Sequence, residues 1–240
     1  MSAALRAEWT KLRTVPDAAI AVPLIGVLTA AVSVIAAGFD SPDAVQSSLL
    51  GVQVGQAAVA VWAVQTMAAE HSTGMARTTF AALPRRLTVL LAKAVLLLGG
   101  VLAAVVPAVL ASVLAGRSML AGYPALTSAT VLRAAGGSVL YLGLIALLAL
   151  GLAAAVRGAV AATGIVLGLL MVPAMLSTFA DPDLQRLVYK LSPSTAGMTV
   201  LSTVDTGTLP IGPWQGLGVA AAWSSGLLAL GALLLARRDV

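Results

Sequence analysis

The amino-acid sequence predicts an all-α, polytopic membrane helical bundle with about six transmembrane helices. Hydrophobic residues make up 60% of the 240 residues and charged residues only 10%, and the mean hydropathy is +1.01. A soluble domain has roughly 25% charged residues, so this chain has too few charges to cover a surface that faces water. The apolar residues are also gathered into stretches of about 20, the length that crosses a bilayer.

Each predicted span is a mostly apolar stretch that a polar or basic segment separates from the next. The six windows cover residues 18–37, 49–69, 87–114, 134–156, 159–179 and 215–236. Pro23, Pro107 and Pro173 lie inside the first, third and fifth windows, which membrane helices tolerate when neighbours satisfy the freed carbonyl groups. Only Arg157 and Gly158 join the fourth and fifth windows, which predicts an antiparallel hairpin. We expect residues 1–240 to form one transmembrane domain.

The basic residues predict how the bundle is oriented. With the N-terminus placed in the cytoplasm, ten of the fourteen Lys and Arg residues lie on the cytoplasmic side. The four outside are Arg117, Arg133, Arg186 and Lys190. Because positive charge favours the inner face of a membrane, both termini are expected in the cytoplasm.

Residues 1–14 are expected to form an interfacial helix that contacts membrane lipids. Leu5, Trp9 and Leu12 follow the i, i+4, i+7 spacing of one helical face and would anchor it at the membrane interface. The indole ring of Trp9 suits the level of the lipid headgroups. The alternative is a flexible basic tail.

The segment 180–213 is expected to lie outside the membrane. Four apolar residues of its first part share one helical face: Leu184, Leu187, Val188 and Leu191. Asp181 or Asp183 would cap this amphipathic helix. The rest of the segment is rich in Ser, Thr, Gly and Pro, and is predicted to be loop.

The sequence excludes most catalytic chemistry. It contains no cysteine, and a single histidine, His71, cannot hold a metal alone. No lysine follows a glycine, so a phosphate-binding P-loop is impossible. Glu8 and Glu70 are the only glutamates, which leaves no zinc-protease motif. We therefore predict no catalytic centre, no cofactor and no metal.

Nucleic acid is not an expected partner, although the net charge is +5 and the isoelectric point is about 10.2. The basic residues lie between apolar stretches, where they act as orientation signals. No acidic residue falls inside a predicted span, which argues against a proton- or ion-coupled carrier. Gln53 and Gln56 share one face of the second span, and Gln65 points roughly the opposite way. Hydrogen bonds between helices are the favoured explanation for these side chains, and contact with a transported solute is the alternative.

The cytoplasmic segment 70–86 is too polar and too patterned to be a simple connection. Ser72 or Thr73 could cap a short helix, and Pro84 would end it. The apolar side of that helix would be formed by Met75, Phe80 and Leu83.

Several segments together resemble a bacterial permease subunit of the ABC-2 type. The resemblance rests on Glu-Trp-Thr-Lys-Leu-Arg-Thr at 8–14 and on Glu-x-x-x-Gly-Met-x-Arg-Thr-Thr at 70–79, with Pro-Arg-Arg at 84–86 and Lys93 after it. It extends to Ser-Pro-x-x-Ala-Gly at 192–197 and to the Arg-Arg-Asp that ends at Asp239. At the level of topology it covers the whole chain.

The resemblance implies an ABC-2 exporter fold and a set of partners. Such permeases pair as identical or related subunits, and each binds a separate cytoplasmic ATPase. The loop between the second and third spans would be a coupling helix seated in a cleft of that ATPase, and the N-terminal helix would touch it. The ATPase-coupling residues implied are Glu70, Thr73, Gly74, Met75, Arg77, Thr78, Thr79, Phe80 and Leu83. Arg85 and Arg86 are explained by stop-transfer charge alone.

The expected function is that of a permease subunit in the bacterial cytoplasmic membrane. It would export an amphipathic solute with the energy of ATP that a partner subunit hydrolyses. Two alternatives remain open at this point: a secondary carrier, and a membrane immunity or interaction protein that works without ATP.

Overall fold

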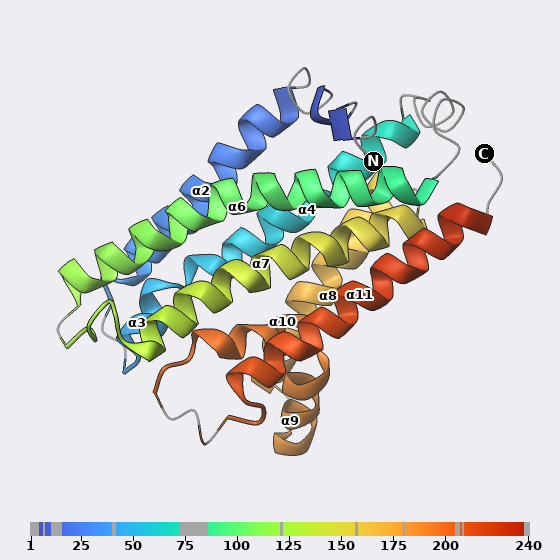
Figure 1. The fold of residues 1–240 in the computed structure, drawn as a ribbon. Helices are drawn as coiled ribbons and strands as arrows, with labels where there is room; N and C mark the ends of the chain where they lie inside the picture. The colour runs from blue at the N-terminus through green and yellow to red at the C-terminus, as the bar shows by residue number, and fades with distance from the viewer. Residues whose placement is uncertain are drawn as a thin grey trace.

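The computed structural model describes most of the chain, with gaps in the first fifteen residues and in the loop that follows the second span. The described residues are 5–6, 8–10, 16–39, 42–72, 86–120, 122–156, 158–179, 181–204, 207 and 209–237, with residues 16, 69–72 and 86 described by backbone alone. Every regular element in this described part is a helix, and no strand occurs in it (Figure 1). Most of the implied coupling residues, Thr73 to Leu83, lie outside it.

Six helices of the described part are long and apolar enough to cross a membrane. They are α2 (Pro16–Ala36), α4 (Gly51–Ser72), α6 (Arg86–Met119), α7 (Ala129–Val156), α8 (Ala159–Phe179) and α11 (Pro213–Arg237). The prediction of an all-α polytopic bundle is therefore confirmed. The α6–α7 hairpin extends beyond its predicted windows, because polar residues such as Arg117 and Ser118 continue the helix past the apolar stretch.

Four short elements lie between the long helices: α3 (Ala44–Ser48), α9 (Pro182–Leu191), α10 (Pro193–Met198) and η1 (Thr199–Leu201). The amphipathic helix predicted after the fifth span is α9, with Asp181 at its N-cap but no hydrogen bond from that side chain. The prediction of a loop after α9 is wrong. Residues 193–201 are helical and largely buried, because packing against α7 and α11 overrides a composition that favours turns.

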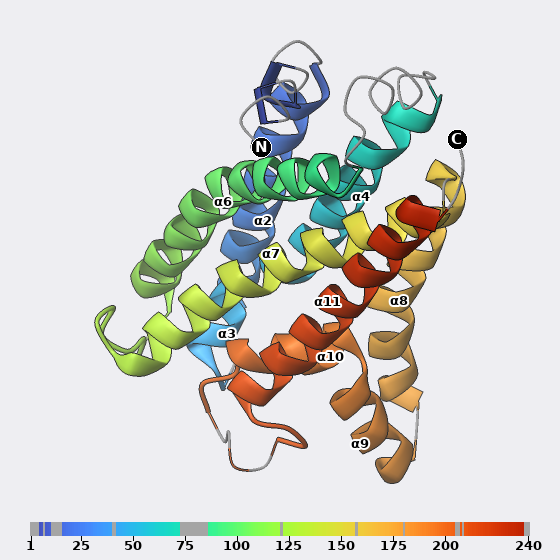
Figure 2. The same ribbon diagram turned by 45° about the vertical axis from the view of Figure 1, so that its right-hand side comes forward.

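Both ends of the described chain lie at one end of the bundle, here called the terminal end. Residues 5–6 and 8–10 and the last turn of α11 are found there, while α3, α9 and α10 lie at the opposite end (Figures 1 and 2). The six long helices therefore run alternately from one end to the other, as an even number of membrane crossings requires.

Helix α7 forms the centre of the bundle and contacts α4, α6, α8 and α11. Within its membrane-length segment 72% of the residues are buried, against 17% for α2 and for α8. Its core side chains Tyr141, Leu142, Ile145 and Leu148 are completely buried. The outer helices α2 and α8 present large apolar residues outward, as lipid-facing helices do.

Glycines permit the closest helix crossings. A Cβ atom on Gly51 would overlap the carbonyl oxygen of Thr29, so α4 and α2 meet backbone to backbone. Gly151 of α7 packs in the same way on the backbone of α11 at Leu227, and Gly231 packs on the carbonyl oxygen of Gly151. Such small-residue contacts replace the hydrophobic driving force that is missing between helices in lipid.

Candidate functional site

A buried ion pair joins the N-terminal segment to the bundle at the terminal end. Lys93 Nζ on α6 lies 2.8 Å from Glu8 Oε2, and the two side chains are 8% and 6% exposed. The same Nζ donates a second hydrogen bond, of 3.1 Å, to the carbonyl oxygen of Thr66 on α4. Removing one member of such a pair strands a buried charge and costs roughly 3–5 kcal/mol, so this anchor holds three segments together.

The anchor joins the two helices that flank the segment singled out by the sequence. Thr66 is in the last turns of α4 and Lys93 in the second turn of α6, so Glu8 is tied to both helices that flank residues 73–85. Of the implied coupling residues, Glu70 is in α4 with its backbone helical. The others belong to the undescribed loop, and their roles stay predictions.

The predicted membrane anchor is placed in part. Residues 5–6 and 8–10 are helical, and the side chain of Trp9 is 56% exposed, while Leu5 is half-buried. Leu12 lies outside the described residues. Glu8 faces the bundle and Trp9 faces away from it, which is the arrangement of an interfacial helix that uses one side for protein and another for lipid.

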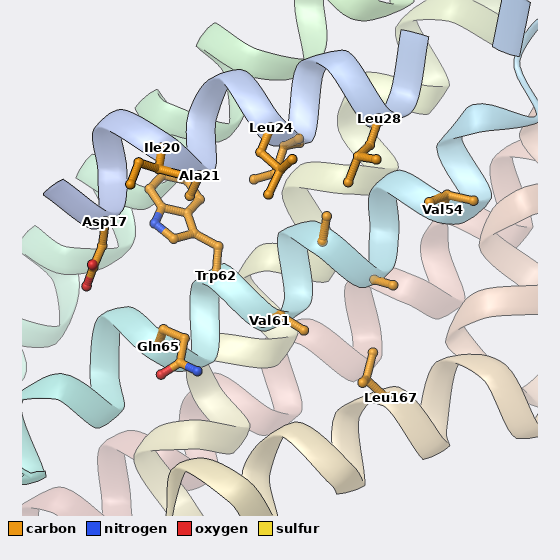
Figure 3. Close-up of a pocket in the computed structure, with 13 residues that line it drawn as sticks. Asp17, Ile20, Ala21, Leu24, Leu28, Val54, Val61, Trp62, Gln65 and Leu167 are labelled. Atoms are coloured by element: carbon orange, nitrogen blue, oxygen red, sulfur yellow. The ribbon is translucent and has the colours of Figure 1, made fainter. Parts of the chain in front are cut away.

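An apolar groove opens on the side of the bundle between α2, α4 and α8, with a volume of about 700 Å³. Its walls are mostly aliphatic side chains: Ile20, Leu24, Leu28, Val54, Val61 and Leu167. Asp17 and Gln65 lie at the end of the groove nearest the terminal end, and the indole ring of Trp62 lies between α2 and α4 beside them (Figure 3). The groove therefore has one polar end and one long apolar part.

The expectation that every span is free of acidic residues needs correction at Asp17. The predicted first window began at residue 18, but α2 begins at Pro16, and its membrane-length segment begins with Asp17 itself. A carboxylate in the first turn of a helix is stabilised by the helix dipole. The helix therefore starts early enough to bring this carboxylate to the groove.

Of the glutamines singled out on α4, only Gln56 makes a hydrogen bond to another helix within the described part of the chain. It is completely buried and accepts a hydrogen bond from the hydroxyl of Tyr141 on α7. Gln53, expected on the same face, is exposed, because α4 turns it away from α7. Gln65 is exposed at the polar end of the groove.

The carboxylate of Asp43 joins two segments at the opposite end of the bundle. It accepts hydrogen bonds from the amide of Thr203 at 2.5 Å, the hydroxyl of Thr203 at 2.6 Å and the amide of Val204 at 3.1 Å. It also caps α3 through the amide of Gln46. Burial alone would raise the pKa of Asp43, but the hydrogen bonds from Thr203, Gln46 and Val204 outweigh it and hold the pKa below its usual value.

A second tie at the opposite end involves Arg133 near the start of α7. One of its guanidinium nitrogens, Nη2, donates a 2.6 Å hydrogen bond to the carbonyl oxygen of Ser202. Because Ser202 precedes the Thr203 that Asp43 holds, the segment after η1 is fixed from two sides. Nearby, the hydroxyl groups of Ser48 and Tyr123 lie 3.1 Å apart.

The sequence did not predict the contacts between side chains that are far apart in the chain. Glu8 and Lys93 each belong to a segment that carried the resemblance, but nothing local to either residue predicts their contact. Asp43 precedes a short helix, which is a capping signal, yet its bonds to Thr203 follow from tertiary packing alone. No group of three His, Asp or Glu side chains that could hold a metal occurs within the described residues.

Comparison with known proteins does not place the chain in a family. No protein-family model matches it, and no curated protein matches it. Its function has to be argued from its own residues.

Proposed function

We propose that this chain is the transmembrane permease subunit of an ATP-binding cassette exporter of the ABC-2 type. It moves an amphipathic solute across a bacterial cytoplasmic membrane, and a separate cytoplasmic ATPase supplies the energy. The permease pairs with a second copy or a related subunit.

The observation that carries the proposal is the anchor formed by Glu8, Lys93 and Thr66. Glu8 and Lys93 come from two of the segments on which the resemblance to ABC-2 permeases rests, and they form a buried ion pair. Through Thr66 the pair also holds the end of α4. An interfacial helix fixed to both helices that flank a cytoplasmic loop is the arrangement that a loop-driven permease needs, because a push on the loop reaches α4 and α6 together.

The charge distribution supports a cytoplasmic location for the terminal end. The described basic residues at this end, Arg6, Lys93 and Arg237, belong to the ten that the positive-inside rule assigns to the cytoplasm. Both described chain ends lie there as well. An ATPase docked on the loop 73–85 would therefore also meet the N-terminal segment.

The groove between α2, α4 and α8 supports an amphipathic solute over an ion. Its walls are almost entirely apolar, and its few polar groups are gathered at one end. A solute with one polar head and an apolar body matches that distribution, whereas a bare ion would have to be desolvated at large cost. The sequence cannot form a P-loop, so the ATP is bound by the partner.

The experiment that tests this function is purification of the tagged permease with the ATPases of its host, followed by reconstitution in lipid vesicles. We expect a cytoplasmic ATPase to co-purify and its hydrolysis to rise when it is bound to the permease. The permease alone should neither bind nor hydrolyse ATP. Solute movement by the permease alone, driven by an ion gradient, would contradict the proposal and favour a secondary carrier.

A further inference from the structure

The polar end of the groove holds three groups without hydrogen-bond partners among the described residues: the carboxylate of Asp17, the amide of Gln65 and the indole N–H of Trp62. The Nε1 atom of Trp62 is buried and unpaired, and the side chains of Asp17 and Gln65 are exposed. All three line the same groove (Figure 3). A ligand in the groove can reach the exposed Asp17 and Gln65, whereas the indole N–H of Trp62 is buried. This end is therefore suited to a ligand whose head pairs with Asp17 and Gln65.

The rest of the groove fits an extended apolar chain. On α2 it runs from Asp17 to Leu28, which spans roughly 16 Å at the rise of an α-helix. Val54 and Val61 of α4 form the facing wall, and Leu167 of α8 closes the side. Its volume of about 700 Å³ is in the range of small-molecule pockets, roughly 300–1,000 Å³.

The charge of the polar end selects the head of the ligand. A cation beside Asp17 gains an ionic contact, and the amide oxygen of Gln65 adds a dipolar contact at the same end. The Trp62 ring lies beside this end (Figure 3). A phosphate or sulfate head would be repelled by the Asp17 carboxylate, and a second protein copy with an apolar face would leave that carboxylate unpaired.

We propose that this groove binds a single-chain cationic amphiphile, with its positive head at Asp17 and Gln65 and its tail along α2 and α4. The claim that this amphiphile is the exported substrate rests on the proposed permease function. The claim that the groove binds it does not depend on that function.

The test uses the fluorescence of Trp62 and a quenching ligand. In the variant Trp9→Phe/Trp214→Phe/Trp223→Phe, Trp62 is the only tryptophan left. Dodecylpyridinium has a cationic aromatic head that quenches tryptophan on contact, and it is titrated into the protein in neutral dodecyl maltoside micelles. Circular dichroism and gel filtration check that the variant is folded, and calorimetry of the same ligand with the unsubstituted chain gives an independent binding curve.

We expect saturable quenching, and half-quenching at a roughly tenfold higher ligand concentration in Asp17→Asn, because a charge-assisted contact is lost. Asp183→Asn is the matched control, since it removes another exposed carboxylate, on α9 at the opposite end. The ligand concentration at half-quenching should be the same for this control as for the parent. Ala57→Phe, which fills the groove from the α4 wall, should also weaken binding while it leaves Asp17 in place.

Three results would overturn the inference. Equal titrations of Asp17→Asn and the parent would show that the carboxylate selects nothing. Equal binding of dodecyl sulfate would mark the groove as ordinary lipid-facing surface. Efficient cross-linking between two copies through Leu24→Cys, with loss of quenching, would assign the groove to a second copy. The binding assay contains no ATPase, so its result is independent of the co-purification experiment. If the ligand does not bind but an ATPase co-purifies, only the assigned substrate class is wrong. If the ligand binds but no ATPase co-purifies, only the proposed permease function is wrong.

Discussion

The hydroxyl of Tyr141 on α7 donates a hydrogen bond to Oε1 of Gln56 on α4 at a point where both side chains are completely buried. We expect Tyr141→Phe to lower the free energy of unfolding by about 1 kcal/mol, because Gln56 is left unsatisfied. The double variant Tyr141→Phe/Gln56→Leu should recover most of that loss, since neither polar group remains. Denaturation by sodium dodecyl sulfate in mixed micelles measures the free energy of unfolding of both variants, with Tyr189→Phe on α9 as the control. A double variant that is less stable than Tyr141→Phe would contradict this account.

The hydrogen bonds of Asp43 make stability depend on pH. Its folded-state pKa is below the ordinary value of 3.8, so the carboxylate stabilises the fold above about pH 4 and the contribution is lost as the pH falls through the lower folded value. We expect Asp43→Asn to be less stable at pH 7 by about 1–3 kcal/mol, because asparagine places an NH2 donor where one of the two carboxylate oxygens accepted two hydrogen bonds. Melting curves from pH 7 to pH 2.5 should therefore converge for the variant and the parent. Asp181→Asn, whose carboxylate caps nothing, should follow the parent throughout.

The anchor between Glu8 and Lys93 should show strong coupling between its two charges. We expect Glu8→Gln and Lys93→Met each to lower stability by roughly 3–5 kcal/mol, because each leaves a buried charge without its partner. The double variant should be close to the parent in stability, as no charge is then buried. If the anchor transmits motion from the loop, the double variant should still show weaker stimulation of the bound ATPase. Full stimulation in a stable double variant would limit the pair to a structural role.

The loop 73–85 should bind its ATPase through apolar contacts more than through charge. A fully buried large side chain gains about 1.5–3 kcal/mol, whereas a surface ion pair contributes about 0–1 kcal/mol. We therefore expect Phe80→Ala to reduce recovery of the ATPase more than Arg85→Ala does, at equal membrane expression. Arg77→Ala should lower stimulated hydrolysis and leave insertion intact. Equal recovery in all three variants would make this loop an ordinary connection.

Single cysteines can test which end of the bundle is cytoplasmic, because the chain has none of its own. Ser118→Cys and Asp183→Cys lie at exposed positions of the opposite end, and we expect both to react with an impermeant maleimide in intact cells. Thr10→Cys, exposed at the terminal end, should react only after the membrane is opened. Labelling of Thr10→Cys in intact cells would invert the proposed orientation.

The sequence was sufficient for the long helices because a bilayer imposes one simple requirement, an apolar stretch of sufficient length. It was insufficient for residues 193–201, where Ser, Thr, Gly and Pro favour turns but burial against α7 produces helix. The groove was not predictable either, since Asp17 and Gln65 are far apart in the chain and line one groove only because α2 packs against α4. The pairing of Glu8 with Lys93 depends on the same kind of distant contact.

The central position of α7 sets a constraint on biosynthesis. The helix follows α2, α4 and α6 in the chain, so the ribosome delivers three spans to the translocon before the central one. During that interval Gln56 has no Tyr141 to bond with, and its amide faces lipid. Helices α2, α4 and α6 contact one another and can wait as a partial assembly. A chain that stalls before Ala129 therefore leaves the amide of Gln56 without its partner within the bilayer.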